Sequence, residues 1–205
     1  MENSKSNYLI PQNIEGKPTD VEHSVTVANS EEAAEIFKTA CSKMLEINKW
    51  HKLIGSASAH FKDANGDDIN PPAKVGDYIR IDIPGPGPSS GDGYDWVRVE
   101  LMDDHRNATC EEESMGMRVR SSKNPKQNDA EVAHFFTGDA TSVFIIHRKA
   151  NVVTSSYHGR NEKLNTDTEK VYDKIRNAIV GTGAFIGLSE LQWSFLMSAF
   201  VKKEN

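Results

Sequence analysis

Cysteine is scarce in this chain of 205 residues, which contains only Cys41 and Cys110. Two cysteines are too few for a disulfide framework, and neither belongs to a Cys-x-x-Cys pair of the kind that holds zinc. Long hydrophobic runs are missing as well, because the longest, Ala178 to Leu188, is about half of the roughly 20 residues that span a bilayer. The opening residues contain no apolar leader. We therefore expect a cytoplasmic protein with reduced thiols and no membrane span.

Positive charge is in deficit, because 24 Lys and Arg residues stand against 30 Asp and Glu residues, for a net charge of -6. A nucleic-acid-binding domain usually carries a basic surplus on one face, so we expect no nucleic-acid partner. The densest basic group comprises Arg118, Arg120, Lys123 and Lys126. A solvated strand and loop explains this group, and a phosphate-binding patch is the alternative.

Signatures of metal and cofactor sites are also lacking. None of the seven histidines shows the His-x-x-x-His spacing of a zinc helix. The segment that begins at Asp63 is unlike a calcium loop, because its glycine, Gly66, is fourth rather than sixth. The glycine- and proline-rich loop over residues 84–94 lacks the Lys-Ser/Thr of a phosphate-binding loop. We therefore expect no cofactor and no metal, and we interpret this loop as a hairpin connection or as a flap over a cavity mouth.

Alternation of apolar and polar residues is the main structural signal in the middle of the chain. Ile79, Ile81 and Ile83, for example, alternate with Tyr78, Arg80 and Asp82. Because each such segment has one polar face, we predict an antiparallel sheet with one covered and one solvated face. The predicted strands cover residues 23–28, 56–61, 77–83, 95–102, 115–120, 141–148 and 152–158.

Helical spacing occurs after the first strand and again at the end of the chain. We expect a helix over residues 30–47, capped by Asn29 or Ser30. A second helical stripe over residues 171–199 is interrupted by Gly181, Gly183 and Gly187, which favours either a helix end with close packing or a hinge.

Together these elements predict an α+β fold, in which a curved antiparallel sheet of about six to seven strands grips a long C-terminal helix. The polar residues 1–20, which show no periodicity, are interpreted as a flexible N-terminal arm. Residues 21–205 are then a single domain.

Several segments follow one another in an order that is found in other proteins. Val25 to Phe37 is a strand that runs into a helix, Lys49 to Ile54 contains a tryptophan before the next strand, and alternating strands begin at Val75 and Asp95. With the closing segment from Thr168 to Lys203, this order resembles the helix-grip superfamily, which includes START domains, the Bet v 1 allergens and polyketide cyclase-like proteins. The resemblance implies an internal apolar cavity between sheet and helix, and it implies no particular activity.

The strand faces and the resemblance favour binding of a small apolar or amphipathic ligand, such as a lipid or polyketide-like molecule, in that cavity. The predicted walls include Ile79, Ile81, Val97, Val99, Leu101, Met117, Phe144 and Ile146, and the amphipathic groups expected to orient a ligand are Trp50, His147, Tyr157 and Trp193. His147 shares a strand face with Val143 and Ile145, which favours an inward position.

The register of the last hairpin stays open at this point, because a one-residue slip exchanges the two faces. A three-residue loop groups His147 with Val153, Ser155 and Tyr157, whereas a four-residue loop groups it with Thr154, Ser156 and His158.

Two other functions are compatible with the same pattern. One is a cyclase- or hydrolase-like enzyme in the same cavity, with His147 or His158 as general base. The other is a cavity-free interaction module that docks through the loop over residues 84–94 or through the interrupted helix. A homodimer is left open.

Overall fold

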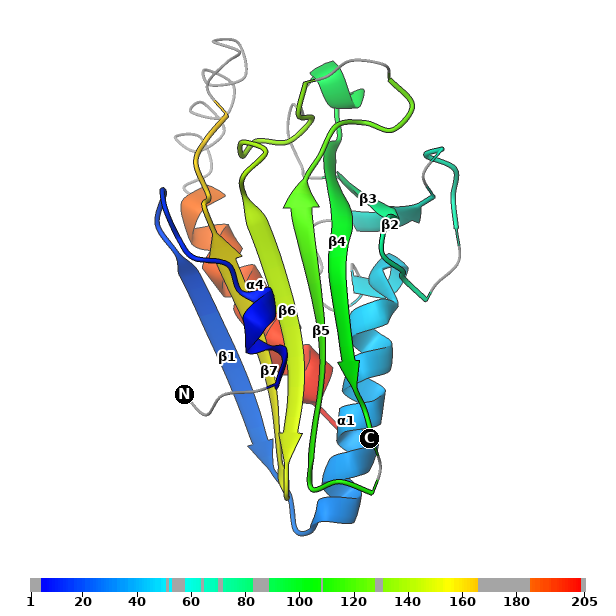
Figure 1. The fold of residues 1–205 in the computed structure, drawn as a ribbon, viewed down its shortest axis with the longest axis vertical. Helices are drawn as coiled ribbons and strands as arrows, with labels where there is room; N and C mark the ends of the chain where they lie inside the picture. Colours follow the sequence, from blue (N-terminus) through cyan, green and yellow to red (C-terminus); the bar gives the residue numbers. More distant parts are fainter. Residues whose placement is uncertain are drawn as a thin grey trace.

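The computed structural model describes residues 5–50, 52, 58–63, 65–69, 72–82, 89–107, 109–127, 131–165 and 185–203. Its seven strands form one antiparallel sheet in the order β1-β7-β6-β5-β4-β3-β2 (Figure 1). The strands are β1 (Thr19–Thr26), β2 (Ser58–Lys62), β3 (Tyr78–Asp82), β4 (Asp95–His105), β5 (Glu112–Ser121), β6 (Thr141–Lys149) and β7 (Val152–Arg160). The helices bounded within the described residues are α1 (Ser30–Leu45), α4 (Phe185–Val201) and three short 3₁₀ helices, η1 (Lys5–Leu9), η2 (Ile47–Lys49) and η3 (Ser89–Gly91). The predicted α+β fold class is confirmed.

Helix α1 begins where its capping residues predict. The side chain of Asn29 accepts a hydrogen bond of 2.8 Å from the backbone N–H of Glu32, and Glu31 and Glu32 lie in the first turn, where the helix dipole favours anions. The apolar residues of the helix form one buried stripe, which consists of Ala33, Ile36, Phe37, Ala40, Cys41 and Met44. This stripe packs against the sheet beside β6 and β7.

One large core lies between the sheet and the two long helices, both of which lie behind the sheet in Figure 1. We call the face of the sheet that α1 and α4 cover the inner face, and the opposite face the outer face. Helix α4 contacts β1, β7 and α1. Inward-pointing residues of the central strands fill the core, including Val97, Val99, Met117, Val119, Phe144 and Ile146.

A β-bulge changes the predicted face of one wall residue. The pairing of β4 with β5 shifts between Val99 and Leu101, so that Val99 pairs with Val119 and Leu101 pairs with Arg118. The extra residue reverses the alternation that follows it. Leu101 therefore packs on the outer face, and Met102 takes its place against the inner core. The prediction that Leu101 faces inward with Val97 and Val99 is wrong for this reason.

The segment expected to be a flexible arm lies against the outer face. Leu9 of η1 is fully buried and packs with Val143 and Ile145. It rests on Gly116, where an added Cβ would collide with the leucine side chain. The hydroxyl of Ser6 also donates a hydrogen bond of 2.9 Å to that of Ser114. In Figure 1 the arm crosses in front of the sheet before it enters β1.

Loops cover another part of the outer face, near the start of β4. Trp96, which the alternation assigns to the polar face, is buried, and its indole N–H donates to the carbonyl of Gly91 at 3.2 Å. The backbone N–H of the same residue donates to the carbonyl of Ala133 at 2.8 Å. The polar span after β5 therefore packs back on the sheet. Residues 83–88, Gly181 and Gly183 lie outside the described residues, so the flap and hinge interpretations stay predictions.

We expect Leu9→Ala to lower the free energy of unfolding by about 2–5 kcal/mol, because it leaves a cavity where a fully buried apolar side chain packs. The measurement is urea unfolding followed by circular dichroism. The matched control is Ile14→Ala, because this side chain of the same arm is 83% exposed and should change stability by less than about 0.5 kcal/mol. Equal effects of the two substitutions would contradict the packed arm.

Candidate functional site

Five aromatic side chains meet between the inner face and α4. Tyr157 stacks on Trp193 with ring centroids 4.3 Å apart and planes inclined by 16°. The ring centroid of Phe144 lies 5.5 Å from that of Trp193 and 5.4 Å from that of Tyr157. On its other side, Phe144 neighbours Trp50, with ring centroids 5.0 Å apart. Phe200 of α4 lies 5.7 Å from Trp50. We call Trp50, Phe144, Tyr157, Trp193 and Phe200 the aromatic cluster.

The local structure fixes the cluster at both ends. Trp50 follows α1 and η2, and its indole N–H donates to the carbonyl of Lys43 at 3.0 Å, which satisfies its polar atom while the ring is buried. Phe144 and Tyr157 are paired residues of β6 and β7, so their rings project together from the same face. Trp193 comes from α4 and is half-buried.

Seven of the eight residues predicted to form the site lie on the inner side. Trp50, Phe144, Tyr157 and Trp193 belong to the aromatic cluster. The other three are core residues: Val99 and Met117 are fully buried, and Ile81 is partly buried against the same core. Their contact with a ligand stays a prediction.

His147 is the exception, because it projects from the outer face. It pairs with Thr154, which selects the grouping with Thr154, Ser156 and His158 from the two that the sequence leaves open. The apolar neighbours Val143 and Ile145 that suggested an inward position are themselves on the outer face, where they pack with Leu9. His147 Nε2 lies 3.1 Å from Glu112 Oε1. The expectation of an inward-pointing His147 is therefore wrong.

A polar network lies at the Tyr157 end of the cluster, and its acidic member was missed in the sequence. The phenol of Tyr157 donates to Glu162 Oε1 at 3.1 Å, and the hydroxyl of Thr19 donates to Glu162 Oε2 at 3.0 Å. Ser142 Oγ lies 3.1 Å from the Tyr157 oxygen. The carboxylate folds back over Gly159, where an added Cβ would collide with it. In the sequence, only Gly159, a glycine within an otherwise regular strand, indicates that another group approaches the backbone here.

The apolar surroundings shift the acid-base behaviour of this network. Burial raises the pKa of Glu162, and the hydrogen bonds from Thr19 and Tyr157 offset only part of that effect. Burial and the neighbouring Glu162 carboxylate raise the pKa of Tyr157 well above its ordinary value, so the phenol keeps its proton. The network therefore combines an acid with a neutral phenol beside an exposed edge of the apolar cluster.

Other polar groups on the inner face have partners within the chain. Arg148 donates to Glu113 Oε2 through its Nε at 2.8 Å, and both side chains are buried. The hydroxyl of Ser155 donates to the carbonyl of Met197 at 2.6 Å. His23 Nε2 lies 2.9 Å from Ser194 Oγ and links β1 to α4. The Arg148–Glu113 pair joins β5 to β6, and the contacts of Ser155 and His23 fasten α4 to the sheet.

His158, the other histidine predicted as a general base, also projects from the outer face. Its Nδ1 lies 2.6 Å from Asp20 Oδ1, and its Nε2 lies 3.0 Å from Ser156 Oγ. This order of atoms is that of a serine nucleophile with its base and orienting carboxylate. Glu22, however, is paired directly with Ser156, and a carboxylate there would repel the oxyanion that such a reaction creates. We interpret the three side chains as a clasp between β1 and β7.

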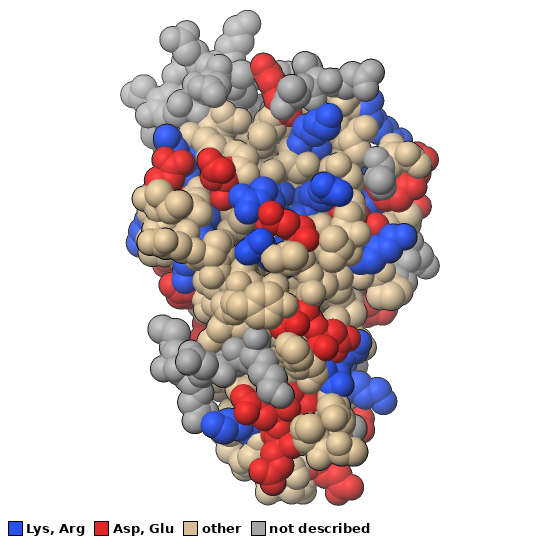
Figure 2. Space-filling model, viewed as in Figure 1, with Lys and Arg blue, Asp and Glu red and all other residues tan. Residues whose placement is uncertain are grey.

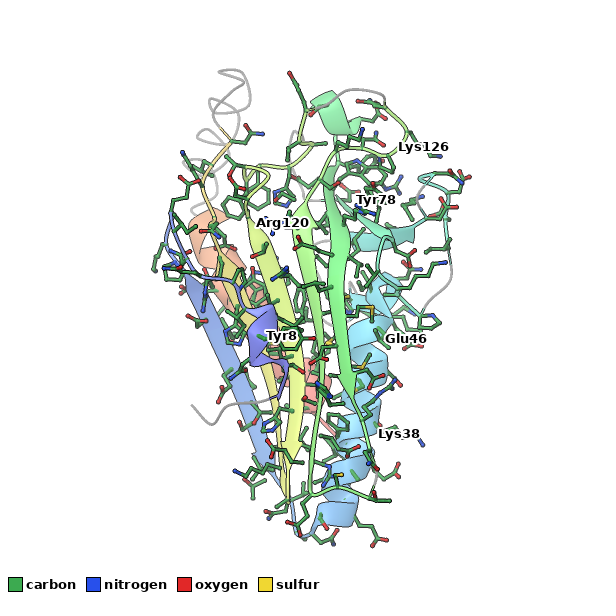
Figure 3. All side chains as sticks on the ribbon, viewed as in Figure 1. Tyr8, Lys38, Glu46, Tyr78, Arg120 and Lys126 are labelled. Carbon is green, nitrogen blue, oxygen red and sulfur yellow. The ribbon has the colours of Figure 1, made fainter. Side chains whose placement is uncertain are left out.

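The basic group that the sequence singled out does not form a free phosphate patch. Arg118 and Arg120 both donate to Glu100, at 2.8 and 3.0 Å. Figure 2 shows blue and red side chains side by side over this face, and Figure 3 labels Arg120 there. Lys126 pairs with Asp67 at 3.1 Å. Among the described residues, no group of three metal-ligating side chains gathers, and no helix there is long and apolar enough to cross a membrane.

Comparison with known proteins finds matches among solved structures alone. No protein-family model matches the chain, and no curated protein matches it in sequence. Among solved structures, the hypothetical protein jhp0584 from Helicobacter pylori has a TM-score of 0.44 at 12% identity, over 88% of this chain and 87% of the other. The di-domain ARO/CYC BexL has a TM-score of 0.37 at 13% identity, over 87% and 45%. Norcoclaurine synthase from Thalictrum flavum has a TM-score of 0.32 at 11% identity, over 88% and 85%.

At these identities the likeness carries no conclusion about activity. The topology of the described residues agrees with the order of elements that the sequence predicts. Strand β1 leads into α1, six strands then run in sequence across the sheet, and α4 closes the inner face. The fold that the resemblance implies, an antiparallel sheet covered by a C-terminal helix, is confirmed.

The clasp gives a prediction for acid stability. Burial raises the pKa of Asp20, but hydrogen bonds and charge from Arg160 and His158 outweigh it and leave that pKa below its ordinary value. Because the folded-state pKa is lowered, ionised Asp20 stabilises the folded state at pH values above its unfolded pKa of about 3.8. This contribution is lost as the pH falls further. Asp20→Asn should therefore cost about 1 kcal/mol at neutral pH, a small value because the carboxylate is partly exposed.

The measurement is urea unfolding at neutral pH and at about pH 3. The substitution should matter less in acid, because the contribution of the lowered Asp20 pKa is lost as the pH falls below about 3.8. Glu22→Gln is the control, since this exposed neighbour lies on the same face of β1. A loss that is the same at both pH values would contradict this role of Asp20.

Proposed function

We propose that the protein binds a small apolar or amphipathic molecule between the inner face of the sheet and α4, beside Tyr157 and Trp193. The observation that carries the proposal is the aromatic cluster with a polar network at one end. Apolar walls with a few placed polar groups are the usual composition of small-molecule sites. Burial of apolar ligand surface would supply the affinity, at about 25 cal/mol per Å² before the cost of ordering.

Trp193 is the residue through which a ligand would enter this site. Its ring is half-buried, whereas its stacking partner Tyr157 is almost completely buried. An indole that already covers an aromatic ring with one face can cover a ligand with a small change of rotamer. The buried methionines Met117 and Met197 belong to the same core, and their flexible side chains adapt readily to added volume.

An enzyme based on His147 or His158 in this site is not supported, because both histidines project from the outer face. An interaction module is the second candidate. Leu191 and Phe195 lie four residues apart on α4, with 57% and 58% of their surfaces exposed. This pair is the part of α4 that such a module would present to a partner.

Native mass spectrometry of the purified protein tests the proposal, followed by denaturation and organic extraction of the same sample. We expect a bound mass of lipid size that is released on unfolding. A ligand-free protein that also fails to bind an apolar fluorescent probe would contradict the proposal. If that protein were in addition a dimer that Leu191→Asp dissociates, the interaction module would replace it.

We further expect Trp193→Ala to weaken binding of the uncharged apolar probe Nile red by about 3- to 10-fold, the value of one aromatic stacking contact. Probe fluorescence during titration gives the dissociation constant. Phe195→Ala is the matched control, because its side chain lies two residues further along α4 and is exposed. Equal weakening by both substitutions would place the probe on the surface of α4 and contradict the site.

A further inference from the structure

The polar network at Tyr157 has a direction, which follows from its donors and acceptors. The single proton of the Tyr157 phenol is used toward Glu162 Oε1. Ser142 must therefore donate its own proton to the phenol oxygen, 3.1 Å away. Thr19 directs its proton to Glu162 Oε2. Every hydroxyl proton in the network thus points, directly or through Tyr157, toward Glu162.

The group that such a network can still accommodate is a donor. A carboxylate offers about four acceptor positions, and the described residues fill one on each oxygen of Glu162. The hydroxyls, by contrast, have no proton left to give. A second acceptor placed here, such as a ligand carboxylate, would meet acceptor atoms alone and would add a like charge to a partly buried acid.

Among the described residues, the cations near Glu162 are already engaged. The guanidinium of Arg160 donates to Asp20 at 2.7 Å and to the carbonyls of Thr19 and Gly159. Lys17 pairs with Glu190 of α4 at 3.5 Å, and Glu190 adds a second negative charge near Glu162. Lys163 pairs with Glu15 at 3.0 Å. The charge that faces the apolar cluster at this end is therefore that of the acid.

We propose that the molecule bound beside Tyr157 and Trp193 is an amphiphile whose polar end is a hydrogen-bond donor, a hydroxyl or an ammonium group, and that Glu162 accepts it. This inference rests on the proposed function and specifies its ligand class. It separates long-chain alcohols and amines, which fit the network, from fatty-acid anions of the same length, which do not. The apolar part of the ligand would lie along Trp193, which stacks directly on Tyr157.

Three probes with the same hydrocarbon chain test the inference: dodecylamine, dodecanol and dodecanoate. Binding is measured by isothermal titration calorimetry at about pH 8, well above the ordinary pKa of a glutamate, to favour the ionised form of Glu162. We expect dodecylamine and dodecanol to bind at least about 10-fold more tightly than dodecanoate. Because chain length is constant, apolar burial cancels and the difference reports the polar end.

Two variants locate the effect. Glu162→Gln should weaken the binding of dodecylamine by about 10-fold, because it removes the charge and one acceptor atom. The affinity for dodecanoate should then lie closer to the affinities for the other two probes. Gly159→Ala should have the same effect while it keeps the charge, because the added methyl group displaces the carboxylate from Tyr157. Glu22→Gln, on the outer face, should leave the order of the three probes unchanged.

The outcomes distinguish the two proposals. Dodecanoate that binds as tightly as dodecylamine to the wild type would overturn the donor preference and leave ligand binding in place. Selectivity that persists in both Glu162→Gln and Gly159→Ala would also overturn it, because the preference would then arise elsewhere. Failure of all three probes to bind the folded wild-type protein would overturn the proposed function and, with it, the ligand class.

Discussion

Burial of both faces of a single sheet is the constraint on which the rest of this structure depends. The inner face is covered by α1 and α4, and much of the outer face is covered by the N-terminal arm and by the loops that pack on Trp96. Strict alternation would place Leu101 inside, so the bulge before it is needed to give the outer face enough apolar surface. The same bulge brings Glu100 between Arg118 and Arg120, so that one carboxylate pairs with both of these arginines on the outer face.

The sequence predicts the fold well because the strand signal is local. Apolar and polar residues alternate in each strand, and the cap at Asn29 marks the start of α1 without reference to the rest of the chain. The strand members of the aromatic cluster follow from the same alternation, since Phe144 and Tyr157 lie on faces that the pattern identifies as apolar or mixed. What the sequence could not provide was the choice between two amphipathic faces when both are partly buried, and His147 was placed on the wrong one for that reason.

Longer-range features were beyond a local pattern. Leu9 lies in a mostly polar segment, and its packing on Gly116 depends on β5, a strand that lies far along the chain. Glu162 is similarly inconspicuous, because its role depends on Thr19, from the first strand, and on Tyr157, from the last. A short loop after β7 turns this acid back over Gly159, and nothing in the spacing of acidic residues indicates such a return. The polar part of the candidate site is thus a tertiary feature, whereas its apolar part is largely a secondary-structure feature.

The position of β1 has a consequence for how the protein folds. Strand β1 is made first, yet its hydrogen-bonding partner in the sheet is β7, with Thr19 opposite Gly159. During synthesis the N-terminal strand therefore remains unpaired until most of the chain has left the ribosome, and its backbone groups are open to other strands in that interval. Contacts between residues so distant in sequence also slow folding, because a long loop must close before they form. The charged outer face of β1, with Asp20 and Glu22, is suited to this interval, since charge on an unpaired strand discourages aggregation.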